Sequence, residues 1–154
     1  MTLAQDLVYK NPMRNCIFLD NHDMDRVFSV VDEDWSRLKM GLTWLLTLRG
    51  IPQLYYGTEV LMKNKKTNTD ATVREDFPGG WKDDAMNRFT SAGRTAKENE
   101  AFNYVSKLAN FIELFFSIFQ IDGVHDGFPP QQLKSCFDDR RFRRIDHERD
   151  ADLQ

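Results

Sequence analysis

This sequence has few cysteines, little excess of charge of either sign and no long apolar run. Its 154 residues carry a formal net charge of -3 and include two cysteines, Cys16 and Cys136. Two cysteines allow at most one disulfide, which excludes a disulfide-stapled scaffold. The small net charge favours neither a nucleic acid nor a membrane surface as partner. Residues 1–15 hold charges and no unbroken apolar run, so we expect neither a signal peptide nor a membrane span there.

Short apolar segments that run directly into polar residues are what the sequence does contain. Ile17, Phe18 and Leu19 form such a run at the end of segment 15–19, and Asp20, Asn21, His22 and Asp23 follow it. An apolar run of this length predicts a buried strand, in which Cys16 would be a reduced, buried thiol. Polar residues at the carboxyl end of a buried parallel strand are typical of an α/β active site. An ordinary turn after the strand is the alternative.

A helix and a second strand follow. Leucines three or four residues apart, an acidic start and Gly50 just past the end predict a helix over residues 34–49. Residues 51–56 form a short apolar and aromatic run, which predicts a strand, and Thr58 and Glu59 come after it. Strand, helix and strand make a βαβ unit with parallel strands. Both strands should therefore point acidic residues toward the same edge.

A long aperiodic stretch separates this unit from the next helix. Residues 63–97 show no helical or strand period, and loops of this length are usually functional or disordered. We favour a functional loop because Phe77 and Trp81 bracket a proline and two glycines, with plain loop packing as the alternative. Thr95 and Glu98 form a capping-box pattern, which predicts a helix that begins there.

The tail, residues 111–154, has neither a convincing alternating pattern nor a turn-and-strand rhythm. Its last part contains Arg140, Arg141, Arg143 and Arg144, with Phe142 between them, together with acidic residues. The acids cancel the positive field that binding of a nucleic acid would need. Two explanations stay open: a segment that folds on a partner, and a reading-frame slip near Asn110, which we favour.

Four segments, taken in order, resemble the alpha-amylase superfamily, glycoside hydrolase family 13. Segment 18–23 (FLDNHD) is similar to the family's fourth signature region, and segment 50–59 (GIPQLYYGTE) to the strand region that follows it. Segments 74–81 (REDFPGGW) and 98–104 (ENEAFNY) are similar to the neopullulanase and cyclomaltodextrinase branch. The resemblance implies an α/β fold, the C-terminal portion of a (β/α)8 TIM barrel with its last two strands and following helices, and an irregular tail. It covers residues 1–110, the C-terminal part of the catalytic barrel, and leaves 111–154 as a divergent, frame-shifted or disordered tail.

The resemblance also implies roles for individual residues. Asp23 would be the catalytic carboxylate that stabilises the transition state of a retaining reaction on starch, pullulan or cyclodextrins. His22, Asn21 and Asp20 would bind or position substrate, and the supporting residues would be Glu59, Tyr56, Arg74 and Trp81. No metal and no cofactor are expected. The partner would be an α-glucan oligosaccharide or polysaccharide, with no nucleic acid and no membrane, while the oligomeric state stays open.

The family's nucleophile and acid/base motifs have no counterpart in this sequence. We therefore expect the isolated chain to be inactive. The alternative is a non-catalytic fragment or a sugar-binding relative without hydrolase activity. The resemblance allows either a periplasmic or a cytoplasmic location.

Overall fold

The computed structural model describes residues 8–67 and 69–119. The chain divides into two compact units, Met1–Leu108 and Ala109–Gln154. Residues 120–154, with most of the expected tail and its arginine block, lie outside the described residues. Among the described helices, none is long and apolar enough to cross a membrane.

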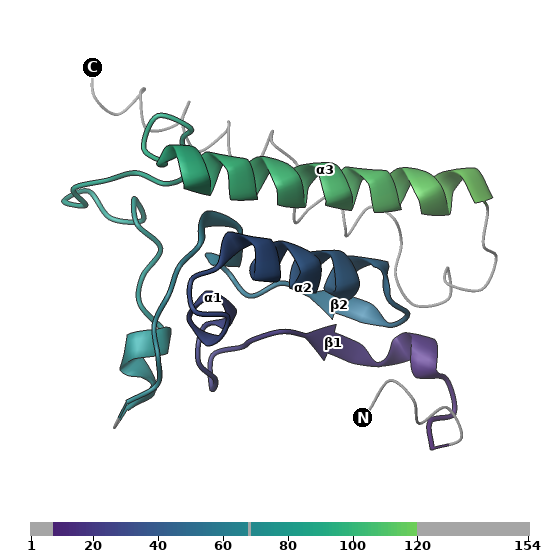
Figure 1. Ribbon diagram of the computed structural model, residues 1–154. Helices are drawn as coiled ribbons and strands as arrows, with labels where there is room; N and C mark the ends of the chain where they lie inside the picture. The colour runs from purple at the N-terminus through teal and green to yellow at the C-terminus, as the bar shows by residue number, and fades with distance from the viewer. Residues whose placement is uncertain (1–7, 68, 120–154) are drawn as a thin grey trace. The chain divides into compact units, whose positions relative to one another are not determined.

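A parallel strand pair joined by a helix forms the base of the first unit (Figure 1). Strand β1 (Cys16–Phe18) pairs with β2 (Ile51–Gln53) in the register Cys16 to Ile51, Ile17 to Pro52 and Phe18 to Gln53. Helix α2 (Trp35–Thr47) connects them, after the single-turn α1 (Val27–Val30). The predicted βαβ unit and its parallel strands are confirmed.

Helix α2 forms where its sequence signals place it. The Asp34 side chain caps it by accepting hydrogen bonds from the backbone N–H of Ser36 at 2.8 Å and of Arg37 at 3.3 Å. Leu38 and Leu42 are fully buried, which confirms the predicted apolar face. The ends fall within two residues of the predicted bounds of 34 and 49.

The face of the strands opposite α2 is exposed, which corrects the expectation of a fully buried strand. Cys16 is exposed and its Sγ donates to Gln53 Oε1 at 3.2 Å, and Phe18 is 43% exposed. Side chains alternate across a strand, so Ile17 and Leu19 turn to the other face, where Leu19 lies against α2. The prediction of a buried Cys16 thiol was wrong because the described residues cover only one face of this pair.

Helix α3 (Ala96–Phe119) begins with the predicted capping box. The backbone N–H of Thr95 donates to Glu98 Oε2 at 2.8 Å, and the backbone N–H of Glu98 donates to Thr95 Oγ1 at 3.2 Å. Its first turns pack on α2, where Trp35 Nε1 donates to Glu100 Oε1 at 2.8 Å and the ring meets Tyr104 edge-on. The helix continues to Phe119, so the start of the expected irregular tail is helical.

Between β2 and α3, the described residues 54–67 and 69–95 form two single-turn 3-10 helices, η3 (Thr58–Val60) and η4 (Asp70–Val73). Gly57 opens η3 with φ of +82°, in the left-handed region. A Cβ at this position would also collide with Met62 Sδ. The turn therefore needs glycine at 57, and it fixes where the chain leaves β2.

Candidate functional site

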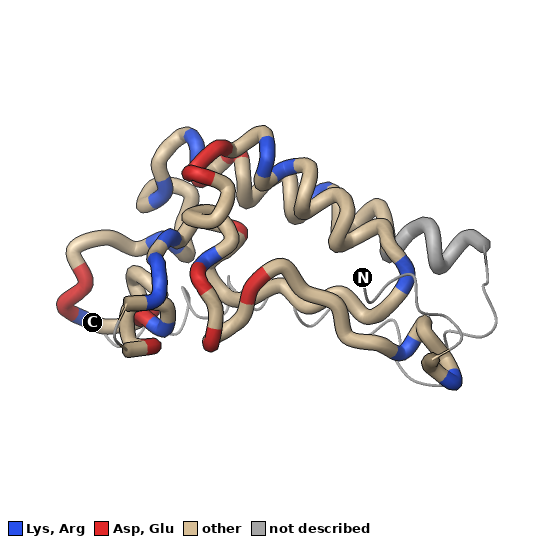
Figure 2. Tube along the Cα trace, turned by 60° about the horizontal axis from the view of Figure 1, so that its bottom comes forward, with Lys and Arg blue, Asp and Glu red and all other residues tan. Residues whose placement is uncertain are grey.

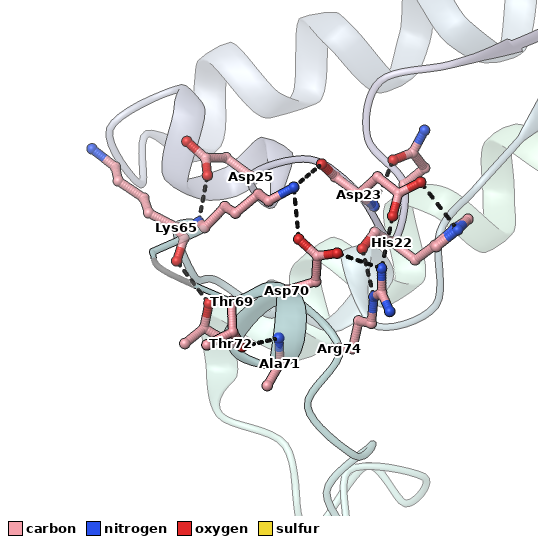
Figure 3. Close-up of polar contacts among 11 residues, drawn as sticks. His22, Asp23, Asp25, Lys65, Thr69, Asp70, Ala71, Thr72 and Arg74 are labelled. Atoms are coloured by element: carbon pink, nitrogen blue, oxygen red, sulfur yellow. Dashed lines mark hydrogen bonds and ion pairs between the residues drawn. The ribbon is translucent and has the colours of Figure 1, made fainter.

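A tight turn at the carboxyl end of β1 presents His22 and Asp23 to solvent. Asn21 Oδ1 accepts from the backbone N–H of Asp23 at 2.8 Å, which forms an Asx turn. The side chains of His22 and Asp23 are 62% and 55% exposed, and His22 Nε2 lies 3.3 Å from Asp23 Oδ2. The close-up in Figure 3 shows both side chains above the loop that follows β2. Two of the predicted site residues are thus side by side, and Asn21 holds the turn that places them.

Arg74 ties this turn to the loop that follows β2 (Figure 3). Its Nη2 lies 2.7 Å from Asp23 Oδ1 and 2.7 Å from Asp70 Oδ2, and its Nε donates to the backbone oxygen of His22 at 2.9 Å. A guanidinium presents donors in a fixed fork, so one side chain can hold two acids and a carbonyl. Arg74 was expected only as a supporting residue, and the structure places it directly on Asp23.

Lys66 adds a second cation beside the same acids. Its Nζ lies 2.6 Å from Asp70 Oδ1 and 3.4 Å from the backbone oxygen of Asp23. The hydrogen bond from Lys66 lowers the pKa of the Asp70 carboxyl, and the charges of Lys66, Arg74 and His22 act in the same direction. Asp25 accepts from the backbone N–H of Lys66 and holds the loop from the other side. The sequence patterns did not indicate Lys66, Asp70 or Asp25, although Lys66 and Asp70 lie in the aperiodic stretch 63–97.

Asp20 lies inward from the exposed turn and is 2% exposed. Its Oδ2 accepts from the backbone N–H of Val27 at 2.8 Å, at the start of α1, and its Oδ1 accepts from Thr58 Oγ1 at 3.5 Å. Burial raises the pKa of the Asp20 carboxyl, against the lowering effect of the Val27 hydrogen bond and the Arg26 charge. Asp20 thus links the end of β1 to α1 and η3.

Arg26 is a buried cation that the sequence analysis did not single out. It is 1% exposed, its Nη1 donates to the backbone oxygen of Tyr56 at 2.5 Å, and its Nη2 has no hydrogen-bond partner among the described residues. The guanidinium lies 4.1 Å from the ring centre of Tyr55 and 4.6 Å from that of Tyr56. Arg26 therefore joins the chain after β1 to the chain after β2.

Glu59 and Tyr56 lie on the β2 side of this arrangement. Burial raises the pKa of the Glu59 carboxyl, opposed by backbone hydrogen bonds at Glu59 and Gly57 and by the charges of Arg26 and Arg94. Burial and the neighbouring Tyr56 raise the pKa of the Tyr55 hydroxyl to about 12. The Tyr56 hydroxyl donates to the backbone oxygen of Glu75 at 2.7 Å, which fixes the chain next to Arg74.

The hydrogen bonds of Trp81 are to Asp76 and Asp84 of its own loop and not to the Asp23 cluster. Its ring Nε1 donates to Asp76 Oδ2 at 2.9 Å, and the residue is 65% exposed. Of the eight predicted site residues, the structure therefore brings His22, Asp23, Asn21 and Arg74 together, places Asp20, Tyr56 and Glu59 around Arg26, and leaves Trp81 on the neighbouring loop.

Acidic and basic residues alternate in the loops beyond the strands, whereas the strands themselves are uncharged (Figure 2). Residues 8–67 and 69–119 contain no group of three or more His, Cys, Asp or Glu side chains that could hold a metal ion. Carboxylates, an imidazole and a guanidinium on exposed turns suit the binding of polar, hydroxyl-rich ligands.

Comparison with known proteins identifies the family of this site. Residues 2–113 match the family model described as alpha amylase, catalytic domain. The chain belongs to this family. Alpha-amylase catalytic domains are TIM barrels and the family acts on α-glucans, so the two parallel strands described here belong to an α/β fold of that class.

Characterised relatives agree with the family match. A cyclomaltodextrin glucanotransferase of Niallia circulans is 37% identical over 92 residues, which cover 60% of this chain and 10% of that protein. An alpha-amylase of Niallia circulans is 38% identical over 92 residues, 60% of this chain and 14% of that protein. A cyclomaltodextrin glucanotransferase of Geobacillus stearothermophilus is 46% identical over 69 residues, 45% of this chain and 10% of that protein. The chain thus spans only a small part of the length of these alpha-amylase family members.

Proposed function

We propose that this chain forms one side of the active site of a retaining glycosidase that acts on α-glucans, with Asp23 as the carboxylate that stabilises the transition state. The observation that carries the proposal is the pairing of Asp23 with His22 on an exposed turn at the carboxyl end of β1. This turn lies inside the stretch that matches the alpha-amylase catalytic domain.

The chemistry of each group supports its role. Glycoside hydrolysis by retention passes through an oxocarbenium-like transition state, whose positive charge a fixed carboxylate stabilises. The Asx turn of Asn21 holds the backbone under Asp23, and Arg74 holds its Oδ1, so the carboxylate is oriented before a sugar arrives. The imidazole of His22 can donate to or accept from the hydroxyls of the same sugar unit. Asp20, buried and fully engaged, positions this turn.

The nucleophile and the general acid/base of the proposed reaction belong to other strands of the complete protein. A retaining site needs these two carboxyl groups about 5 Å apart, and the motifs that carry them in the family have no counterpart in this sequence. The isolated chain should therefore release no reducing sugar from starch, pullulan or cyclodextrins. Release above a buffer blank that Asp23→Asn abolishes would contradict this division of roles.

A chain that also contains the upstream barrel strands tests Asp23 directly. Asp23→Ala should lower kcat far more than it raises KM, because the proposed interaction strengthens at the transition state. His22→Ala should have a milder effect. Asp25→Ala is the matched control, since this acid lies on the same turn but bonds the backbone of Lys66. A loss for Asp23→Ala that is confined to KM would reassign Asp23 to substrate binding.

We further propose that the complete enzyme belongs to the neopullulanase and cyclomaltodextrinase branch. Segments 74–81 and 98–104 support this assignment. A higher kcat/KM for cyclodextrin hydrolysis than for starch is the expected result. Formation of cyclodextrins from starch would instead place the enzyme with the glucanotransferases.

A further inference from the structure

We propose that Trp81 is a stacking platform for a further glucose unit of an α-glucan chain that extends from the Asp23 site. The residue is 65% exposed, yet the hydrogen bond from its ring Nε1 to Asp76 Oδ2 fixes the orientation of the indole. An exposed ring that is already fixed loses little conformational entropy when a ligand covers it. Trp81 is therefore prepared for a flat ligand before that ligand binds.

Hydrogen bonds also fix the loop that carries Trp81. Asp84 Oδ2 accepts from the backbone N–H of Gly79 at 2.6 Å and from that of Trp81 at 3.1 Å. The rings of Phe77 and Phe89 pack with their centres 4.4 Å apart on either side of this turn in the sequence. The platform is thus a built turn with its own small apolar base.

The indole face and the carboxylates near it favour a sugar as ligand. The face of an indole carries partial negative charge, which attracts the partly positive C–H bonds on the face of a glucopyranose. Asp76 is exposed beside the ring, and its carboxylate can accept from the hydroxyls at the sugar's edge. A second carboxylate, Asp84, lies under the same turn, so a phosphate-bearing ligand would be repelled.

The position of the platform connects it to the Asp23 site. Arg74 contacts Asp23, and the Tyr56 hydroxyl holds the backbone oxygen of the next residue, Glu75. Asp76 follows directly, and two residues of extended chain reach about 7 Å. Trp81 is bonded to Asp76, so the platform lies on the loop that carries Arg74, along the course of a glucan that extends from Asp23. The choice of an α-glucan as ligand rests on the proposed function, whereas the platform itself rests on Trp81.

Affinity electrophoresis of the full chain tests the platform without any need for catalysis. The chain should be retarded in native gels that contain glycogen, relative to gels without it. Trp81→Ala should weaken this retention by about tenfold, the low end of the range for removal of an aromatic ring stacked on a nucleobase. Trp81→Phe should fall between the two, because it keeps an aromatic face but loses the bond to Asp76. Trp44→Ala, which removes a 56% exposed tryptophan of α2, is the matched control and should change nothing.

A measurement without the Trp81 variants covers the case in which they fold badly. In the Trp44→Phe background, maltoheptaose should protect tryptophan fluorescence from acrylamide quenching, and maltose should protect it less. Absence of both retention and protection would overturn the platform, as would equal losses for Trp81→Ala and Trp44→Ala. Retention that depends on Trp81 would support the platform even if a complete enzyme showed no hydrolysis. Failure of the platform and failure of the proposed function can thus be told apart.

Discussion

Replacement of Arg26 by methionine should destabilise the folded unit more than any other single arginine change described here. The substitution keeps the length of the aliphatic stem and removes the guanidinium, which is buried among Tyr55, Tyr56 and the carboxyls of Asp20 and Glu59. The chain segments after β1 and after β2 would lose the cation that joins them.

The expected cost follows from the contacts that disappear. A hydrogen bond from a charged donor contributes about 1.5–3 kcal/mol, and each of two desolvated cation–π contacts about 1–2 kcal/mol. Arg26 Nη2 is buried without a hydrogen-bond partner in the described part of the chain, and its removal relieves a desolvation cost of about 1–3 kcal/mol. We therefore expect a net loss of about 3 kcal/mol, a large share of the stability of an ordinary small domain.

Urea unfolding followed by circular dichroism measures this loss, with trimethylamine N-oxide added so that the wild-type midpoint falls in range. The control is Arg37→Met, whose side chain is 58% exposed and pairs with Asp32 at 3.0 Å. Such surface pairs contribute about 0–1 kcal/mol. The double variant Arg26→Met/Glu59→Gln should lose less unfolding free energy than the sum of the two single effects, because it also removes the half-buried Glu59 carboxyl that Arg26→Met leaves without its cation. Equal free energies of unfolding for Arg26→Met and Arg37→Met would refute the reasoning.

Three further predictions concern the same unit. Burial raises the folded-state pKa of Glu59 above its usual 4.5, so the stability that this group contributes is present at low pH and falls as pH rises through the folded pKa. Glu59→Gln should therefore match the wild-type Tm near pH 4 and exceed it near pH 7. The control Asp83→Asn should not raise the Tm at pH 7. Thr95→Ala should cost about 1 kcal/mol of unfolding free energy through loss of the capping box, which Thr95→Ser should largely restore, and equal stability of all three proteins would contradict the cap. The uncovered strand face with Phe18 should make the isolated chain bind a hydrophobic dye, and Phe18→Ser should reduce that signal, whereas unchanged dye binding would place the apolar surface elsewhere.

Features set by near neighbours in the sequence were predictable. The leucine spacing that defined α2 and the Thr95 and Glu98 pattern that begins α3 both act over three or four residues. The parallel pairing of β1 and β2 followed from the handedness and length of a βαβ connection. The Asx turn that presents His22 and Asp23 likewise forms between near neighbours, Asn21 and Asp23.

Contacts between distant residues were not predictable from local patterns. Arg74 and Asp23 are 51 positions apart, and nothing in the sequence of either segment indicates their ion pair. The role of Arg26 depends on where the chain after β2 passes, 30 positions away. The exposure of Cys16 depends on what covers the second face of the strands, which strand composition alone does not specify.

Gly57 has a practical consequence for mutagenesis of this protein. A library that varies Tyr56 and Thr58 would also reach Gly57, which lies between them. Every replacement of Gly57 combines a left-handed backbone with a collision against Met62. Library members mutated there should therefore carry a strained turn and have a lower stability. Screening capacity is better placed at the exposed positions of the Trp81 loop, such as Lys82 and Asp83, where side chains face solvent and the backbone is held by its neighbours.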